Sequence, residues 1–397
     1  MRSIELTKNI FYVGVDDRCT DLFENHLPLP AGVSYNSYLI VDEKVVLIDP
    51  VDISFIGEFL DRLDAVLGDR AIDILVVNHA EPDHSGSVAV LTQKYPDMQV
   101  VGNAKTFAPL EAFYGPIAHK VVVADGETMP IGAHTLQFFT APMVHWPESM
   151  ATYEQSTGIL FSNDAFGGFG VLNGGIFDDQ HDLAWYEDEM RRYYANIVGK
   201  VAAPTLKVIQ RLSTLDIKMI APSHGLVWRQ RLDWVLDKYT QWSQHAGEEG
   251  VVIAYGSMHG NTARMAGIVA QGVADAGIRA VRVYDVARTD ASFILSDIWR
   301  YRGVALGSNA HYGSMFPELA TLTHELIQFK PQGKQYAIFG GMSWSGGGVS
   351  TLRKLADEAH WPLVSDSVEV KGAPGRPDDT DRLYQLGLTL GNAIKNQ

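Results

Sequence analysis

The stretch Ile72-Asp73-Ile74-Leu75-Val76-Val77-Asn78-His79-Ala80-Glu81-Pro82-Asp83-His84-Ser85-Gly86 decides the fold of the first part of the chain. Its apolar, largely β-branched beginning predicts a buried strand. Four side chains that can bind a metal ion follow within six residues, namely His79, Glu81, Asp83 and His84. Irregular backbone after a strand end does not confine side chains to one face, so it can direct all four into one cavity. We therefore expect a metal site at the end of this strand.

The same pattern recurs at three other places, where an apolar segment leads to a His or an Asp. The segments and their candidate ligands are 136–141 with His145, 158–161 with Asp164, and 217–221 with His224. A single histidine after a strand is usually a capping or surface residue, but four such strand ends together favour a metal site. Mixed imidazole and carboxylate ligands suit iron, manganese or zinc. Seven ligands are too many for one ion and suit two ions with a bridging carboxylate.

Composition narrows the class of protein. The chain has 397 residues, enough for two to three domains. With 32 basic and 47 acidic residues its formal net charge is −15, which repels phosphate backbones and disfavours nucleic-acid binding. No apolar run approaches the roughly 18 residues of a membrane helix. Cys19 is the only cysteine, which excludes an internal disulfide, an iron–sulfur cluster and a cysteine metal site. We expect a cytoplasmic protein that binds no membrane and holds any metal with His and carboxylate.

The two halves of the chain differ in pattern. The first half mixes strands and helices: residues 33–48 alternate as a hairpin with its turn at 42–44, and residues 55–67 and 183–197 have helical periodicity. The polar segment 244–250 then predicts a short linker. We accordingly expect one domain over residues 1–249 and a second over residues 250–397.

The second half alternates strands with helices. Strands are predicted at 251–255, 280–284, 303–306, 335–339 and 363–370, and helices beginning at Thr262, Ser292, Pro317, Gly348 and Asp378. Five parallel strands separated by helices fit a doubly wound sheet.

Three loops at strand ends of the second half are candidates for binding a phosphorylated cofactor. In the first, Gly256-Ser-Met-His-Gly-Asn-Thr262, small and hydroxyl residues let backbone N–H groups surround a phosphate at a helix N-terminus. It has neither GK[ST] nor GxGxxG, which argues against a triphosphate or a dinucleotide. Such a loop alone equally well caps a helix, but loops 308–313 and 340–347 follow later strands, and ligands of doubly wound sheets bind at these ends.

The three loops resemble the FMN site of flavodoxins. We expect Trp344 or Tyr312 to pack near the isoalloxazine, although either could be a simple loop anchor. The candidate FMN contacts are Ser257, Met258, His259, Gly260, Asn261, Thr262, Ser308, Asn309, Ala310, His311, Tyr312, Gly313, Ser343, Trp344, Ser345, Gly346 and Gly347.

The metal motifs resemble a known family. HxHxDH is the signature of metallo-β-lactamase-like hydrolases, which bind zinc pairs, and this chain has Glu81 at the position of the second His. That replacement resembles the flavodiiron proteins, as do His145-Trp146-Pro147, residues 162–166 (Ser-Asn-Asp-Ala-Phe) and Ser223-His224-Gly225. The resemblance covers the whole chain. It implies an N-terminal metallo-β-lactamase-like αββα sandwich followed by a flavodoxin-like domain with a doubly wound, five-stranded parallel sheet.

The resemblance also implies how the ligands divide. One iron would be held by His79, Glu81 and His145, the other by Asp83, His84 and His224, with Asp164 as the bridge. Three carboxylates against two Fe(II) leave about one net positive charge to bury, and the additional carboxylate stabilises Fe(III), as a redox site requires. No catalytic residue beyond these ligands is expected.

Two positions depart from the family pattern. Many relatives carry Phe-His-Gly near the N-terminus, with a His that supports the metal ligands, whereas this chain has Leu22-Phe23-Glu24. His26 lies nearby, and we interpret it as an ordinary loop histidine. Glu148 stands where relatives tend to have Asp. Tyr193 and Tyr194 could donate protons near the metals or could simply pack.

The resemblance implies an oxidoreductase. FMN would collect electrons and pass them to a non-haem diiron centre that reduces O2 to water, NO to N2O, or both. The single cysteine leaves no fused rubredoxin, so we expect a separate donor, either a rubredoxin-like protein or a reduced cofactor. We also expect a head-to-tail homodimer, with a dimer of dimers as an alternative assembly. Two alternatives are a metallo-β-lactamase-type hydrolase fused to a flavodoxin domain and an electron carrier whose first domain is structural.

Overall fold

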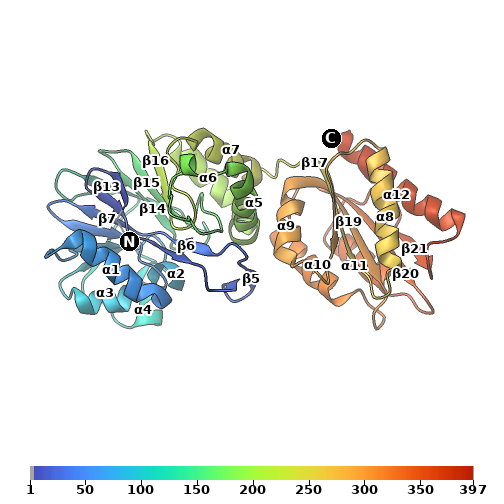
Figure 1. The fold of residues 1–397 in the computed structure, drawn as a ribbon, viewed down its shortest axis with the longest axis horizontal. Coiled ribbons are helices and arrows are strands. Elements are labelled where there is room, and N and C mark those ends of the chain that lie inside the picture. The colour runs from blue at the N-terminus through green and yellow to red at the C-terminus, as the bar shows by residue number, and fades with distance from the viewer. Residues whose placement is uncertain (1–3, 397) are drawn as a thin grey trace. The chain divides into compact units, whose positions relative to one another are not determined.

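The computed structural model describes residues 4–396. Its chain forms two compact units, with the boundary between Ser243 and Gln244 (Figure 1). The first strand of the second unit, β17 (Glu248–Gly256), begins just before the boundary expected at 249/250. Among residues 4–396 no helix is both long enough and apolar enough to span a bilayer.

Two main sheets form the centre of the first unit. One has seven strands in the order β1-β2-β7-β8-β9-β10-β11 and the other five in the order β12-β13-β14-β15-β16. The strands of the first are β1 (Ile4–Thr7), β2 (Ile10–Tyr12), β7 (Tyr38–Val41), β8 (Val45–Ile48), β9 (Ile74–Val76), β10 (Gln99–Gly102) and β11 (Lys120–Val122). Those of the second are β12 (Thr128–Pro130), β13 (Thr135–Thr140), β14 (Met150–Glu154), β15 (Ile159–Asn163) and β16 (Met219–Pro222).

The expected hairpin is present in part. Val41 pairs with Val45 across the predicted turn, which confirms the β7–β8 hairpin. The first residues of the predicted hairpin do not belong to it. They form β6 (Val33–Tyr35), which pairs with β3 (Val15–Asp17) in a separate small sheet. A second small sheet joins β4 (Leu22–Phe23) and β5 (Leu27–Pro28).

Helices cover both outer sides of the paired sheets, giving the expected αββα sandwich. Figure 1 shows α1, α3 and α4 on one side of the strands and α6 and α7 on the other. The helices are α1 (Ile56–Leu67), α2 (Pro82–Ser85), α3 (Val88–Lys94), α4 (Phe107–Tyr114), α5 (Leu183–Tyr193), α6 (Ala202–Leu212) and α7 (Leu232–Ser243). Short 3₁₀ helices lie at η1 (Ile53–Phe55), η2 (Asp178–Gln180) and η4 (Gly199–Val201). The helix predicted over 183–197 is present as α5 followed by a π-helical segment, η3 (Tyr194–Val198).

Strand direction brings the candidate ligands to one edge of the second sheet. Because β14 is antiparallel to both β13 and β15, and β16 is parallel to β15, the C-terminal ends of β13, β15 and β16 share an edge. The segments that leave these three ends carry His145, Asp164 and His224. Consequently residues that are about 80 positions apart along the chain can contribute to one site.

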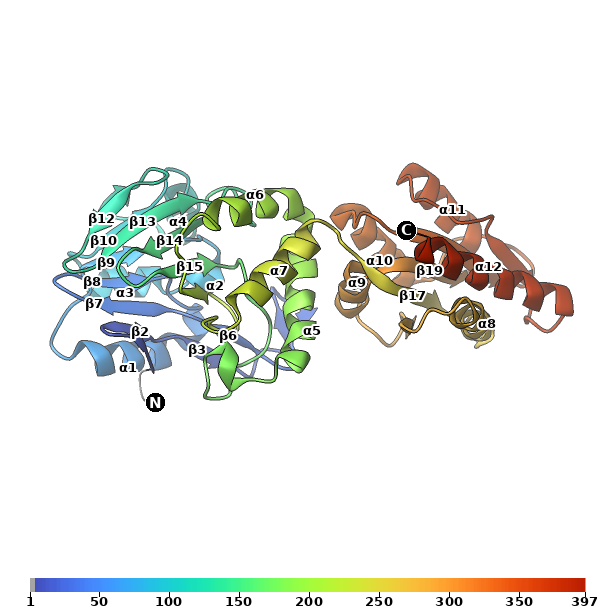
Figure 2. The ribbon, with the colours of Figure 1, turned by 90° about the horizontal axis from the view of Figure 1, so that it is seen from above.

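The second unit is a doubly wound parallel sheet in the order β18-β17-β19-β20-β21, which is the flavodoxin-like order. Figure 2 shows α8 and α12 on one side of this sheet and α9, α10 and α11 on the other. Besides β17 the strands are β18 (Val281–Asp285), β19 (Tyr301–Asn309), β20 (Gln335–Met342) and β21 (Val368–Lys371). The helices are α8 (Asn261–Asp275), α9 (Ala291–Arg300), α10 (Pro317–Phe329), α11 (Gly348–Glu358) and α12 (Pro377–Lys395).

One predicted strand is too long. Residues 363–370 were expected to be extended throughout, but β21 begins only at Val368. Leu363 makes an isolated bridge to Tyr336, and the chain between Leu363 and Val368 is bent and irregular.

Candidate metal centre and cofactor cavity

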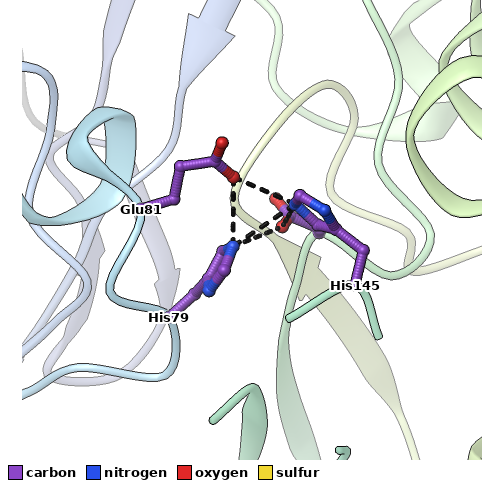
Figure 3. Close-up of side chains that lie close together, drawn as sticks. His79, Glu81 and His145 are labelled. Atoms are coloured by element: carbon purple, nitrogen blue, oxygen red, sulfur yellow. Dashed lines mark hydrogen bonds and ion pairs between the residues drawn. The ribbon is translucent and has the colours of Figure 1, made fainter. Parts of the chain in front are cut away.

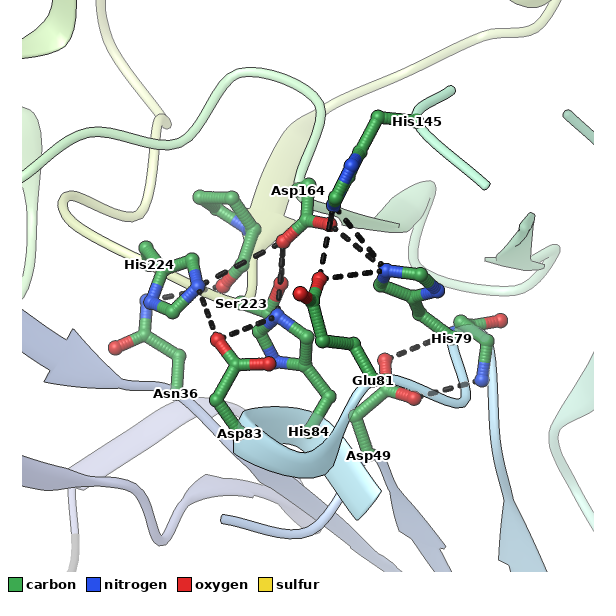
Figure 4. Close-up of polar contacts among 12 residues, drawn as sticks. Asn36, Asp49, His79, Glu81, Asp83, His84, His145, Asp164, Ser223 and His224 are labelled. Carbon is green, nitrogen blue, oxygen red and sulfur yellow. Dashed lines mark hydrogen bonds and ion pairs between the residues drawn. The ribbon is translucent and has the colours of Figure 1, made fainter. Parts of the chain in front are cut away.

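The structure brings all seven candidate metal ligands together in the first unit (Figure 4). They form two groups, within each of which one nitrogen or oxygen atom per residue lies within 4.8 Å of the others. The groups are His79, Glu81, His145 and Asp164, and Asp83, His84 and His224. Apart from Asp164, which falls in the first group, each group holds the residues that the resemblance to the flavodiiron proteins assigns to one iron.

In the first group, three side chains point their donor atoms at one another (Figure 3). Glu81 Oε2 lies 3.1 Å from His79 Nε2 and 2.9 Å from His145 Nε2. The two Nε2 atoms are 3.3 Å apart. Two imidazole nitrogens and a carboxylate oxygen converging on one point form a donor set suited to a borderline divalent cation.

In the second group, Asp83 Oδ2 lies 3.3 Å from His84 Nε2 and 3.2 Å from His224 Nε2. Asp164 faces both groups with different oxygens. Its Oδ2 is 3.3 Å from His145 Nε2, while its Oδ1 is 2.9 Å from His84 Nε2. A carboxylate that presents one oxygen to each group is placed as a bridge between two ions.

Buried atoms without partners test whether these residues fit a metal pair. Both carboxylate oxygens of Asp83, His84 Nε2, His224 Nε2 and Asp164 Oδ2 are buried and have no hydrogen-bond partner among the described residues. Burying polar atoms without partners is costly. A cation held within each group would pair with the His and Asp atoms that face it, so the residues present fit two metal ions.

The electrostatics of the site favour positive charge. Burial acts to lower the pKa of His84, but the carboxylates of Asp83 and Asp164 raise that pKa to about 9. Burial likewise acts to raise the pKa of Asp164, yet the imidazoles of His84 and His145 hold it well below its usual range. Both shifts come from carboxylates and imidazoles that stabilise each other's charged forms, so positive charge is favoured beside Asp83 and Asp164.

Contacts behind the ligands fix their orientation. His79 Nδ1 donates to Glu148 Oε1 at 2.7 Å, and His224 Nδ1 donates to the Ser34 carbonyl at 2.8 Å. With Nδ1 committed in this way, Nε2 of each imidazole is left to bind metal. The sequence marks Glu148 only as a departure from the family pattern. Ser34 acts through its backbone, for which the sequence carries no signal.

The segment that departs from the family's Phe-His-Gly still reaches the metal centre. The ring of Phe23 lies 5.5 Å from that of His224. Glu24 is exposed in the turn, but partial desolvation beside the metal centre and the neighbouring carboxylate of Glu81 raise the pKa of Glu24 to about 7. His26 is exposed in the turn, as expected.

A cavity of about 700 Å³ lies at the strand ends of the second unit. It falls within the usual size range of cofactor sites. The predicted residues that line it are Ser257, Met258, His259, Asn261, Thr262, Asn309, Ala310, His311, Tyr312, Gly313, Ser343, Trp344 and Ser345. Within residues 4–396, Ser257 Oγ and Asn309 Oδ1 are buried and have no hydrogen-bond partner, and Tyr312 and Trp344 are 99% and 89% exposed. Unpaired polar atoms beside open aromatic rings suit a ligand that is both polar and flat.

Four of the predicted contacts do not line this cavity. Ser308 is fully buried and bonds to backbone of its own loop, and Gly260, Gly346 and Gly347 also lie outside the wall. Gly347 instead shapes the loop, since it has φ +134° and a Cβ there would lie 2.3 Å from the Gly313 carbonyl carbon. Three further residues line the cavity: Gly341 and Met342, which belong to the predicted loop 340–347 but were not among the candidate contacts, and Gly372, which lies outside the three predicted loops. Gly372 follows β21, a strand end at which the sequence showed no motif.

Two family models match the chain, one for each unit. The ODP family beta lactamase model matches residues 33–225, and the Flavodoxin model matches residues 253–381.

Relatives match over nearly the whole chain. The anaerobic nitric oxide reductase flavorubredoxin of Vibrio vulnificus is 36% identical over 373 residues, covering 91% of this chain and 75% of that protein. The rubredoxin oxygen:oxidoreductase of Desulfovibrio gigas has a TM-score of 0.95 at 30% identity, covering 100% of this chain and 99% of that one. The flavodiiron protein of Giardia intestinalis has a TM-score of 0.95 at 29% identity, covering 100% and 97%.

Proposed function

The chain belongs to the flavodiiron protein family, and from that premise we propose that it is an oxidoreductase that reduces O2 to water, NO to N2O, or both. Its cofactors are FMN and a non-haem diiron centre. The observation that carries the proposal is Asp164, whose two oxygens face two separate groups of ligands. Two metal positions sharing one carboxylate suit a substrate that must be bound at two points.

The roles of the individual residues follow from their positions. His79, Glu81 and His145 would hold one iron, Asp83, His84 and His224 the other, and Asp164 both. When bound, the iron pair and FMN together supply the electrons that the gas accepts. The protein contributes burial and orientation. His79, His84 and His224 are at most 1% exposed, so these three ligands are shielded from water.

In the second unit, the loop at Ser257–Thr262 would hold the FMN phosphate. Its backbone N–H groups lie at the N-terminus of α8, where the helix dipole favours an anion. Tyr312 and Trp344 would pack near the isoalloxazine. The electron donor would be a separate rubredoxin-like protein or a reduced cofactor.

We further propose that the working form is a head-to-tail homodimer. Each site lies within its own unit, and exposed apolar side chains occur near both. Leu22 precedes Phe23, whose ring contacts His224, and Met143 lies two residues before His145. Met258, Tyr312 and Trp344 line the cofactor cavity. Charge favours the same pairing, since residues 1–243 hold 32 acidic and 18 basic residues, against 15 and 14 in residues 244–397. Pairing a metal unit with a flavin unit avoids bringing two strongly acidic units together.

Gas consumption after reduction tests the proposed activity. The purified protein is reduced anaerobically and mixed separately with O2 and with NO, while an electrode follows each gas and chromatography detects N2O. We expect at least one gas to be consumed in many turnovers, with about two iron and one FMN per chain. Two zinc ions and negligible iron after expression with ample iron would instead support the hydrolase alternative. Glu81 in place of the second His argues against that alternative.

A further inference from the structure

Helix α5 carries a row of readily oxidised side chains beside the metal centre. Tyr186, Met190 and Tyr193 are spaced i, i+4 and i+7, so they lie one above another on one helix face. All three are at most 2% exposed. Among apolar side chains, Tyr, Trp and Met lose an electron most easily, and Leu or Phe would fill a helix face equally well. The row therefore offers a chemistry that packing alone does not require.

The inner end of the row meets the candidate ligands. The Tyr193 ring centroid lies 5.5 Å from that of His224. Tyr186 reaches the same loop, because its hydroxyl oxygen accepts from the Leu226 N–H at 3.1 Å, two residues beyond His224. Two tyrosines of α5 thus contact the loop that carries the candidate ligand His224.

The outer end of the row reaches the surface of the unit. Trp185 precedes Tyr186, and their ring centroids lie 6.5 Å apart. Its side chain is 48% exposed, in contrast to the buried row behind it. A continuous series of oxidisable groups therefore runs from His224 through α5 to a solvent-exposed indole.

We propose that Tyr193, Met190, Tyr186 and Trp185, which we name the α5 relay, conduct oxidising equivalents from the metal centre to the surface when O2 arrives without enough flavin electrons. The inference rests on the proposed function, since reduction of O2 generates those equivalents. It adds a protective activity that is separate from gas reduction.

The electron balance defines when the α5 relay is needed. Reduction of O2 to two waters takes four electrons and four protons, of which two iron(II) ions supply two electrons and reduced flavin the other two. If the flavin is oxidised, Tyr193 gives one electron to the oxidised centre and its phenolic proton to the water being formed. Met190, Tyr186 and finally Trp185 return the missing electron to Tyr193 in turn. Tyr193 takes up one proton from solvent as it is reduced, Trp185 releases its indole proton to solvent, and the two remaining protons of the two waters also come from solvent. A soluble thiol then reduces Trp185, and two such events oxidise two thiols to one disulfide and complete the four electrons.

The experiment compares the unmutated holoprotein with W185F and with W361F. The matched control, Trp361, lies in the second unit and stacks on Tyr336, outside the α5 relay. Each protein is reduced with two electrons fewer than full reduction requires, mixed with O2 in the absence of thiol, and frozen for electron paramagnetic resonance. Parallel samples are digested for mass spectrometry. A second arm uses hydrogen peroxide in place of O2.

We expect a protein radical and oxidation products on Trp185 well above those on Trp361. W185F should keep the turnover rate of the unmutated protein under excess donor, but it should lose iron after several-fold fewer electron-limited cycles. Its oxidation products should move inward to Met190 as the sulfoxide. W361F should behave as the unmutated protein.

Two results would overturn the relay: equal oxidation of Trp185 and Trp361, or equal survival of W185F and the unmutated protein. The peroxide arm separates this failure from failure of the proposed function. A radical on Trp185 with peroxide supports the relay even in protein that does not reduce O2 with flavin electrons. Absence of that radical with peroxide overturns the relay, while normal O2 consumption by fully reduced protein would still uphold the proposed function.

Discussion

At the scale of single residues, Asp164 is the side chain on which both metal positions depend. Its Oδ2 faces the first ligand group and its Oδ1 the second, and it is 1% exposed. We expect Asp164→Ala to abolish gas reduction, because both ions lose a ligand and part of the charge that compensates them. Iron content and turnover are measured together with the flavin absorbance, which should be unchanged. Near-normal turnover with full iron would show that Asp164 is not the bridge.

Glu148 gives a second test, of orientation rather than ligation. It accepts from His79 Nδ1 at 2.7 Å and from the Ala80 N–H at 3.1 Å. Loss of such a contact behind a ligand typically lowers metal affinity about 10–100-fold. We expect Glu148→Gln to fall in this range, measured by competition with a chelator, with FMN content unchanged. Glu154→Gln is the control, since Glu154 is buried but bonds Ser156 and Thr157 away from the ligands. Equal affinity of Glu148→Gln and unmutated protein would assign Glu148 a purely structural role.

The residues that the sequence could and could not predict differ in how they act. The seven candidate ligands follow the ends of apolar strands. The sequence predicts them because a cluster of polar residues directly after a buried strand is unusual. The structure gathers all seven, and their binding of iron stays a prediction. Ser34 supports His224 through a carbonyl, and any residue type has one. Gly372 joins the cofactor cavity only because β21 lies beside β20, a fact of topology rather than of local sequence.

At the scale of elements, a hydrogen bond between a carboxylate and an imidazole links the two main sheets of the first unit. Asp42, in the turn between β7 and β8, accepts from the backbone N–H and from Nδ1 of His134, at 2.8 and 2.6 Å. His134 directly precedes β13 in the other sheet. Burial acts to raise the pKa of Asp42, but these hydrogen bonds favour the charged form and lower the pKa to about 2.

The depressed pKa of Asp42 fixes the sign of a pH dependence. The unfolded chain, with the ordinary value of 3.8, binds more protons than the folded one between pH 3.8 and about 2. The stabilisation is therefore complete above pH 3.8 and is lost as the pH falls through about 2. We expect Asp42→Asn to cost roughly 1–3 kcal/mol at neutral pH. Urea unfolding at a series of pH values should show this difference shrinking below pH 3.8.

The control for this prediction is Asp64→Asn, which removes an ion pair with Lys94 in which Asp64 is 57% exposed. Exposed pairs contribute less than about 1 kcal/mol. A cost for Asp42→Asn as small as that for Asp64→Asn would mean that the link between the sheets is not stabilising.

Element boundaries were predictable where local pattern and tertiary pairing agree. The turn at 42–44, helix α1 and the alternation of strands with helices in the second unit follow from hydrophobic periodicity and turn residues. Periodicity fails where the backbone changes type without changing burial. The apolar face of α5 continues into the π-helical segment Tyr194–Val198, which is also largely buried, so residues 183–197 read as one helix. Likewise β6 continues the alternation of β7 and β8 but pairs with β3.

At the scale of the whole molecule, the head-to-tail dimer predicts that two defective chains can restore each other. One chain lacks the metal site through Asp164→Ala with His79→Ala, and the other has its phosphate loop disabled at Ser257 and Thr262. If electrons pass from the flavin of one protomer to the irons of its partner, a mixed dimer retains one cross-subunit pair of intact sites. A C2 interface presents the same contact twice, so the loss of one pair leaves the other working.

Activity after subunit exchange therefore measures the direction of electron transfer. Electron transfer weakens steeply with distance, so only a flavin held against the irons can serve them. We expect each variant alone to be inactive and the mixture to regain up to about a quarter of the unmutated turnover per chain, because random exchange makes half of the dimers mixed and each of these has one working pair. Mass spectrometry of differently tagged chains verifies the exchange. The control mixture pairs two metal-deficient variants, Asp164→Ala and His79→Ala, which share one defect and should stay inactive. Should the first mixture also stay inactive despite verified exchange, electrons must travel within a single chain, and the interface would then serve assembly rather than catalysis.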